Sequence, residues 1–159
     1  MRQKRILSIL IILAILGSGQ LSAKEIPFSV APDFKLMDTY QDKITLSDYK
    51  DKQPVVLFFW ATWSPVCEKE LTMLNSMYSV LAKEGIETLA INVGDLQDTV
   101  DDFVKNLNLA YRVLLDKDAR VSNLFQAQVP TYILIDRKGT IVFKDTYFPQ
   151  GTYKDLVLD

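Results

Sequence analysis

The strongest constraint on the fold is a change of hydrophobic period between residues 54 and 81. Val55–Trp60 is a continuous run of apolar, β-branched and aromatic residues, which is typical of a strand covered on both faces. Ser64 and Pro65 follow, and these residue types favour the N-cap and the first position of a helix. Beyond them one helical face carries an apolar stripe, made of Cys67, Leu71, Leu74, Tyr78 and Leu81. The pattern therefore predicts a buried strand that leads directly into an amphipathic helix.

The remaining segments alternate between strand and helix patterns along a chain of 159 residues, which is long enough for one domain. Strands are expected at Phe34–Met37, Lys43–Leu46, Ile86–Val93, Arg112–Leu115, Thr131–Asp136 and Ile141–Lys144, and helices at Asp98–Leu107 and Ala119–Phe125. The last residues, Tyr153–Leu158, have the pattern of a helix that stops early. This order predicts an α/β fold with a mixed central sheet flanked by helices and an N-terminal β-hairpin extension.

Residues 1–23 have the layout of a secretory signal peptide or an N-terminal membrane anchor. Basic residues at positions 2, 4 and 5 precede an apolar run over residues 6–16, and Ala23 is a plausible last residue before cleavage. The run is short against the roughly 20 residues of a comfortable membrane span, and the sequence leaves cleavage and anchoring open. We expect export to the periplasm or to the outer face of the cytoplasmic membrane, with the folded domain at residues 24–159 and an extended arm over residues 24–33.

The composition excludes several kinds of chemistry. The chain has no His and one Cys, so it offers no Ser-His-Asp triad, zinc knuckle, iron–sulfur cluster, haem attachment site or internal disulfide. We therefore expect no cofactor and no metal site. Residues 24–159 hold 15 basic and 20 acidic residues, a net charge of −5, and no basic run appears among them. Nucleic-acid binding depends mostly on contacts to phosphates, so this charge balance argues against it.

Cys67, the only thiol of the chain, has a position with chemical meaning. If Ser64 is the N-cap, Cys67 is the third helical residue, where free backbone N–H groups and the positive end of the helix dipole stabilise a thiolate. The Ser64 hydroxyl can then bond the Cys67 N–H or lie near its sulfur. The alternatives are a small buried apolar residue for Cys67 and a plain helix cap for Ser64.

The segment Phe58–Leu71 resembles the active-site segment of TlpA/ResA-like thiol–disulfide oxidoreductases, whose pattern is Phe-Trp-Ala-Thr-Trp-Cys-x-x-Cys-x-x-Glu. The resemblance extends from about residue 31 to residue 143 and implies a thioredoxin-like fold. Val129-Pro130-Thr131 looks like the family's cis-proline loop beside the dithiol. Glu70 stands where the family has a carboxylate that handles protons near the site, with an exposed helix carboxylate as the alternative. Against the family's pattern, we expect the last helix of this chain to be truncated.

The sequence departs from the family at Ser64, which stands where the attacking cysteine is found. A serine hydroxyl at neutral pH is a poor nucleophile without a base, and no His is present to serve as one. The resemblance therefore implies a redox protein that exchanges thiols and disulfides through Cys67, with ordinary two-thiol turnover lost. The expected catalytic residues are Cys67, Ser64 and Glu70, and the expected substrate-binding residues are Trp63, Pro65, Val129, Pro130 and Thr131. Its partners would be protein thiols or disulfides in the extracytoplasmic space.

Two other functions stay open. Ser64-Pro65-Val66-Cys67 is similar to the Thr/Ser-x-x-Cys motif of peroxiredoxins, in which the last cysteine reacts with peroxide. However, Trp60 stands where those enzymes have Pro, and Pro130 stands roughly where they have Arg. The third function is a non-catalytic module that binds extended peptides beside Pro130. The exposure of Cys67 distinguishes best among the three, because a buried thiol favours the binding module.

Overall fold

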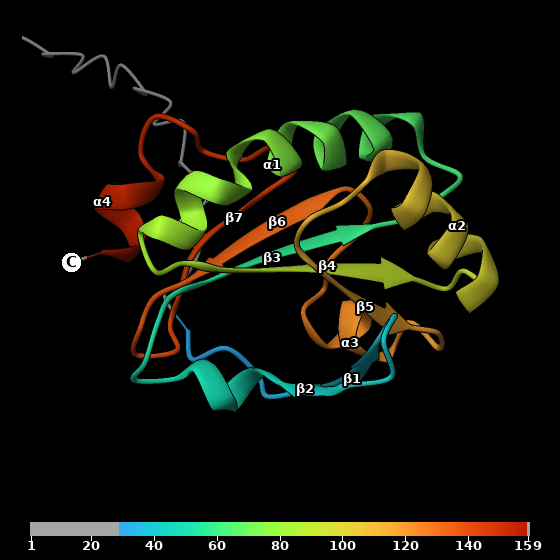
Figure 1. Ribbon diagram of the computed structural model, residues 1–159. Coiled ribbons are helices and arrows are strands. Elements are labelled where there is room, and N and C mark those ends of the chain that lie inside the picture. The colour runs from blue at the N-terminus through green and yellow to red at the C-terminus, as the bar shows by residue number, and fades with distance from the viewer. Residues whose placement is uncertain (1–28, 159) are drawn as a thin grey trace, which may run out of the picture.

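The computed structural model describes residues 29–158, so the expected leader at residues 1–23 and residues 24–28 of the arm lie outside the described residues. Strands and helices alternate along this range as the sequence predicts (Figure 1). In chain order they are β1 (Lys35–Asp38), β2 (Lys43–Thr45), a 3₁₀ helix η1 (Leu46–Tyr49), β3 (Val55–Trp60), α1 (Pro65–Lys83), β4 (Glu87–Val93), α2 (Gln97–Leu107), β5 (Arg112–Asp116), α3 (Arg120–Leu124), β6 (Thr131–Ile135), β7 (Ile141–Asp145) and α4 (Tyr153–Val157).

A seven-stranded mixed sheet, in the order β2-β1-β5-β4-β3-β6-β7, forms the middle of the domain. β3, β4 and β5 run parallel, whereas β1, β2, β6 and β7 are antiparallel to their neighbours. The carboxyl ends of β3 and β4 therefore meet at one edge of the sheet, and α1 and α2 begin just beyond that edge. β1 and β2 form the expected N-terminal hairpin, which joins the sheet through β5.

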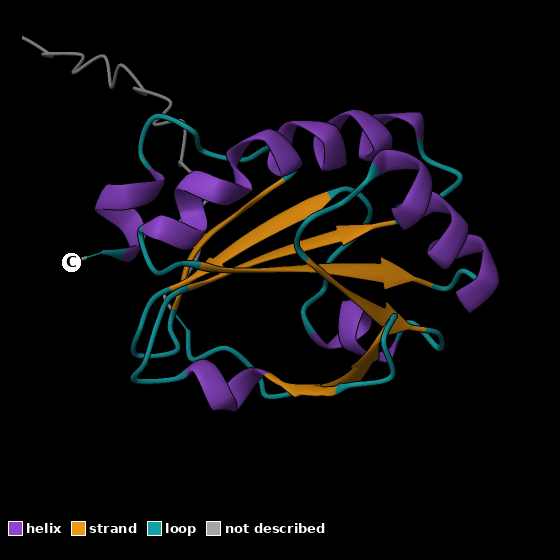
Figure 2. Ribbon diagram, in the orientation of Figure 1, coloured by secondary structure: helices purple, strands orange, loops and turns teal. Residues whose placement is uncertain are grey.

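Helices cover both faces of this sheet, with α1, α2 and α4 on one side and η1 and α3 on the other (Figure 2). Side chains of a strand alternate between the two faces, so each face of β3 supplies its own core. Phe58 lies in the core with α1, α2 and α4, and the next residue, Phe59, lies in the core with η1 and α3. Every residue of β3 is buried, which confirms the expectation of a strand covered on both faces.

Several boundaries differ from those expected. The strand predicted to end at Leu46 stops at Thr45, because Leu46 opens η1 while its backbone N–H still bonds the carbonyl of Phe34. The first strand begins at Lys35 and continues to Asp38, whose buried carboxylate accepts hydrogen bonds from two backbone N–H groups of the following turn. Tyr78, predicted on the inner face of α1, is only half-buried at the edge of the core.

Residues 29–31 of the expected arm are extended and run beside the start of β7. The Ala31 N–H bonds the Gly139 carbonyl at 2.8 Å, and the Ile141 N–H bonds the Ser29 carbonyl at 2.9 Å. This pairing fixes the described start of the chain at the turn between β6 and β7. Within residues 29–158 there is no helix that combines the length and the apolar character required to cross a bilayer.

Candidate functional site

The site expected from the sequence lies where β3 passes into α1, at the carboxyl edge of the parallel strands. Ser64 is the N-cap of α1, and its hydroxyl oxygen accepts a 3.3 Å hydrogen bond from the Cys67 N–H. Pro65 occupies the first helical turn, where its missing N–H costs no hydrogen bond. Both the cap and its bond to Cys67 are confirmed.

Cys67 is fully buried, with no exposed surface, and no disulfide engages it. It shares one face of α1 with Leu71, Leu74 and Leu81, so the period of the stripe accounts for its burial. The neighbours on the outer face of the same turn, Pro65 and Val66, are exposed. The thiol thus lies behind the first turn of α1 and is closed off from solvent, as its place on the stripe predicts.

The Val129–Pro130 peptide bond is cis, as expected. β6 is antiparallel to β3, with Thr131 opposite Phe59, so this register carries Val129 and Pro130 past the end of β3 toward the Ala61–Ser64 loop. Val129 and Pro130 are half-buried and Thr131 is buried. The structure therefore brings the proposed binding residues of the proline loop to the edge where Ser64 and Cys67 lie.

Trp63 projects from the loop between β3 and α1 and is 70% exposed, although it is a large aromatic residue. A cluster of polar groups holds this loop in place. One carboxylate oxygen of Asp95 accepts 2.8 Å hydrogen bonds from both the Thr62 N–H and the Asn92 side-chain amide. Sequence reasoning missed Asn92 and Asp95, although a buried Asn inside an apolar strand is a polar signal that could have drawn attention to them.

Glu70, one helical turn after Cys67, is half-buried and bonded to β6. The Tyr132 hydroxyl donates a 3.1 Å hydrogen bond to Oε2 of Glu70, and the Glu70 carbonyl oxygen lies 3.5 Å away. The Tyr132 ring is fully buried and stacks on Phe58, with 4.3 Å between ring centroids. Burial, and after it the Glu70 carboxylate, raise the pKa of Tyr132; Tyr111 and Cys67 also contribute. Tyr132, which was not among the expected site residues, thus belongs to the site.

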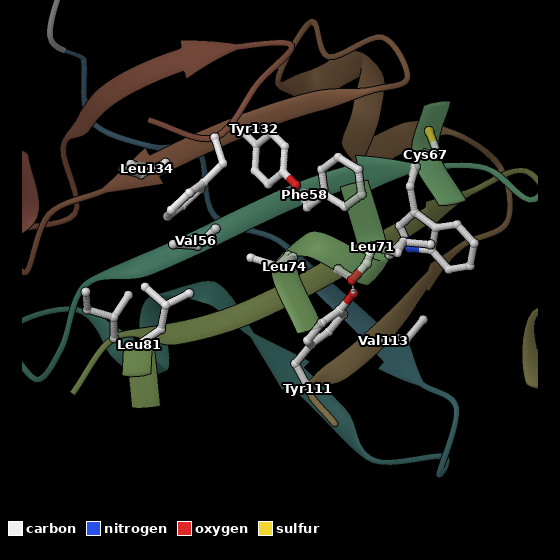
Figure 3. Packing of buried hydrophobic residues seen from close by; sticks show 14 of the residues in the cluster. Val56, Phe58, Cys67, Leu71, Leu74, Leu81, Tyr111, Val113, Tyr132 and Leu134 are labelled. Carbon is white, nitrogen blue, oxygen red and sulfur yellow. Dashed lines mark hydrogen bonds between the residues drawn. The ribbon is translucent and has the colours of Figure 1, made fainter. Parts of the chain in front are cut away.

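A second buried tyrosine, Tyr111, holds the same turn of α1 from the other side. Its hydroxyl donates a 2.9 Å hydrogen bond to the Leu71 carbonyl oxygen. Tyr111 directly precedes β5 and Tyr132 lies on β6, and these strands flank the β3–β4 pair under α1. In the close view of this core, Tyr111 and Tyr132 approach α1 from opposite sides (Figure 3). Adjacent residues of one helix, Glu70 and Leu71, are therefore fixed by tyrosines from both sides.

Comparison with known proteins agrees with this geometry. Residues 28–144 match the AhpC/TSA family. Thiol-disulfide oxidoreductase ResA from Geobacillus kaustophilus is 38% identical over 114 residues, which cover 71% of this chain and 65% of that protein. The chain thus spans about 65% of the length of this relative.

Two solved structures share the fold. A protein from Chlorobium tepidum described as a thiol:disulfide interchange protein, DsbE, has a TM-score of 0.73 at 24% identity, over 82% of this chain and 94% of that chain. Peroxidoxin BcpB from Mycobacterium tuberculosis has a TM-score of 0.67 at 22% identity, over 80% and 90%. The thioredoxin-like fold expected from the sequence is confirmed. Since the fold is shared by an oxidoreductase and a peroxidoxin, the choice between their chemistries depends on the site.

Proposed function

Because this chain belongs to the AhpC/TSA family, we propose that it is an extracytoplasmic thiol–disulfide oxidoreductase of the ResA kind that exchanges through the single thiol of Cys67. One observation carries the proposal. Cys67 lies in the first turn of α1, with its N–H capped by Ser64, at the sheet edge to which β6 brings the cis-proline loop. These are the positions at which the resemblance puts the redox motif and its peptide groove.

The exchange that this arrangement supports is a single transfer. The sulfur of Cys67 bonds to one sulfur of a partner disulfide, the partner's S–S bond breaks, and the departing thiolate takes up the proton that Cys67 gave up. Ser64 has no sulfur with which to resolve the mixed disulfide, so a second external thiol must release it. The protein then works as an acceptor or carrier of one thiol and has no internal dithiol cycle.

Burial sets the rate of this exchange. A partner sulfur must approach Cys67 along the S–S axis, and the first turn of α1 closes that approach in the described conformation. Reaction therefore requires local opening of the Ser64–Pro65 turn, with partner residues held meanwhile by Trp63 and the Val129–Thr131 loop. Local openings of this kind cost less free energy than global unfolding, so the exchange is slow but does not need the unfolded chain.

The proposed location rests on residues 1–23, whose basic start and apolar run are typical of an export signal or anchor. A fusion of residues 1–40 to a reporter that is active only outside the cytoplasm tests this. Reporter activity is expected, and its loss is expected when residues 2, 4 and 5 are made acidic. Activity confined to the cytoplasm would contradict the proposed location.

The exchange itself is tested by mass spectrometry of the intact folded protein incubated with a cysteine-containing peptide disulfide. We expect one adduct per chain, located on Cys67, reversed by dithiothreitol and absent in Cys67→Ala. The matched measurement is iodoacetamide alkylation, expected to be at least about a hundredfold slower for the folded than for the denatured protein. Folded protein that never forms the adduct, while the denatured chain does, would reject exchange.

The burial of Cys67 favours a second function, peptide binding without exchange, and Trp63, which is 70% exposed, offers a contact for a peptide. Exchange remains the first proposal because the relative at 38% identity is a thiol-disulfide oxidoreductase. It predicts the same affinity for an extended cysteine-free peptide in the parent protein and in Cys67→Ala, and no adduct. The peroxidase alternative has less support. Arg112 is paired with Asp38, and Arg120 of α3 lines a groove with Phe34 and Lys35 on the other face of the sheet. Arg137 lies in the turn after β6, at the opposite end of the sheet from Cys67.

A further inference from the structure

Glu70 lies three residues after Cys67 on α1, and its orientation needs an explanation, because Glu68 of the same turn is exposed whereas Glu70 is not. Residues three apart on a helix are neighbours on its surface, with about 5–6 Å between their Cβ atoms. A Glu side chain at such a position is long and mobile, and it normally turns to solvent. Here it is half-buried and accepts a hydrogen bond from a buried phenol. The cause of its position is therefore Tyr132 and not the helix alone.

We propose that Tyr132 is the positioning residue of this site, because its hydroxyl holds the Glu70 carboxylate against β6, one helical turn after Cys67. This inference rests on the proposed thiol exchange. It adds the residue that holds Glu70, the proton acceptor of that exchange, in position. Tyr132 follows Thr131 directly, so the same residue also joins the proline loop to the helix that carries the thiol.

The tyrosine is well suited to hold a fixed position. Its ring has no exposed surface and is held by Phe58 on one side, at 4.3 Å between centroids, and by Phe148 on the other, at 5.5 Å. With the ring locked, the hydroxyl oxygen has a fixed position, 3.1 Å from Oε2 and 3.5 Å from the carbonyl oxygen of Glu70, and the shorter bond holds one end of the carboxylate. The second oxygen of Glu70 is left to accept a proton.

The step that this serves is the loss of the thiol proton from Cys67. As the sulfur of Cys67 bonds to a sulfur of the partner disulfide, Glu70 accepts the thiol proton and then passes it to the departing partner thiolate. The partner disulfide is the oxidant, one S–S bond breaks as one forms, and the proton count is unchanged. Tyr132 keeps its own proton throughout and acts only by holding Glu70.

Tyr111 provides a matched control. Its hydroxyl is also buried and also bonds α1, at the carbonyl oxygen of Leu71, but it touches no carboxylate. Tyr132→Phe and Tyr111→Phe each remove one phenol hydroxyl from the same helical turn. If the two hydroxyls are purely structural, each variant loosens the helix and exposes Cys67, so that Cys67 reacts faster. A positioning role slows the reaction in Tyr132→Phe alone, so the two roles differ in the sign of the effect.

The test is the rate constant for reaction of Cys67 in the folded protein with dithiodipyridine, an uncharged aromatic disulfide whose released thiopyridone is followed by absorbance. Tyr132→Phe is expected to slow the reaction by about tenfold, a part of the factor that a positioned base supplies. Glu70→Gln is expected to slow it at least as much, and the double variant no more than Glu70→Gln. Tyr111→Phe is expected to react as fast as the parent or faster. A Tyr132→Phe variant that matches or exceeds the parent would overturn the proposal.

A second measurement separates this inference from the proposed function. The same variants are made in Ser64→Cys protein, and reduction of insulin driven by dithiothreitol is followed. If the parent fails to react with dithiodipyridine but Ser64→Cys turns over and is slowed by Tyr132→Phe, exchange through a single thiol is wrong and Tyr132 still positions Glu70. If Tyr132→Phe and Tyr111→Phe have equal effects in both measurements, Tyr132 is structural only.

Discussion

The hydroxyl oxygen of Ser64 accepts the 3.3 Å hydrogen bond from the backbone N–H of Cys67, so the N-cap of α1 is bonded directly to the residue that carries the buried thiol. One side chain thus does two things. It stabilises the turn that closes off Cys67. Under the proposed function it also leaves the outer position of the motif without a thiol, which suits protection of Cys67 better than rapid turnover.

Replacing Ser64 is expected to separate these two effects. Ser64→Cys should give the protein measurable insulin reduction with dithiothreitol, because the flanking loop, Glu70 and the proline loop are in place. Ser64→Ala should remain inactive and lose about 1 kcal/mol of unfolding free energy, since the capping hydrogen bond is gone. Turbidity of insulin and urea denaturation measure the two quantities. If the Ser64→Cys protein folds normally but does not reduce insulin, the absence of a cysteine at position 64 is not the only reason for the lack of turnover.

Glu87 is expected to make stability fall as the pH rises. Burial raises the pKa of Glu87 above its ordinary value of 4.5, against the opposing effects of Arg112 and of the Gln53 hydrogen bond. The folded state therefore binds more protons than the unfolded state, and the stabilisation present below the ordinary value is lost as the pH rises through the folded value. Glu87→Gln keeps an acceptor for Gln53 and removes the buried charge. Its midpoint of thermal unfolding should exceed that of the parent at pH 7 by more than it does near pH 4.

Glu84 is the control of opposite sign for this experiment. A hydrogen bond from Lys154 lowers the pKa of Glu84, so its contribution is present above the ordinary value and is lost as the pH falls. Glu84→Gln should lower the unfolding midpoint near neutral pH and match the parent in acid. If the unfolding midpoints of the two variants, relative to the parent, changed with pH in the same direction, burial would not be the main effect at Glu87 or pairing with Lys154 would not be the main effect at Glu84.

Tyr111 and Tyr132 are expected to stay protonated in alkaline solution for as long as the protein is folded. Burial is the main cause that raises the pKa of each above the ordinary value of 10.0. The unfolded chain loses these protons first, so both residues favour unfolding as the pH rises beyond about 10. Absorbance of tyrosinate should show their ionisation only together with alkaline unfolding. Tyr132→Phe should reduce the amount of tyrosinate that forms in that unfolding step.

Asp95→Ala is expected to destabilise the protein by about 2 kcal/mol, because it leaves the Thr62 N–H and the Asn92 amide without an acceptor. The matched control is Asp118→Ala, which removes an exposed carboxylate whose one bond, to the Arg120 N–H, measures 3.3 Å. Its effect should lie within about 0.5 kcal/mol. Urea denaturation measures both. Equal effects would mean that Asp95 is not needed to hold the Trp63 loop.

The features that the sequence predicted well are those that local pattern determines. The period of the apolar residues in β3 and α1, with Ser64 and Pro65 between them, was enough to place the thiol on a buried helix face. The strand expected to reach Leu46 was wrong at that end, because the last apolar residue of an alternating strand and the first buried residue of a 3₁₀ turn look the same in a pattern. Periodicity reports which side of an element is buried, and it does not report where the backbone turns.

The polar contacts of the site could not be predicted from the sequence, for a different reason. Tyr132 and Glu70 are 62 residues apart, and Asp95 is 33 residues from Thr62, so no local pattern relates them. Glu70 was predicted only through the family motif. Tyr132 was not predicted, because a tyrosine in an apolar strand has the pattern of an ordinary core residue. Such pairs become visible only when the register of β6 against β3 is known.

The pairing of residues 29–31 with the start of β7 places the described start of the chain at one end of the sheet, opposite to the end where the candidate site lies. The chain enters the domain beside Gly139, at the turn that ends β6, whereas Ser64, Cys67 and Pro130 lie where β3 ends and β6 begins. The two places are at opposite ends of the same strands (Figure 1). A partner that binds beside Ser64 therefore meets the end of the domain that lies away from residue 29.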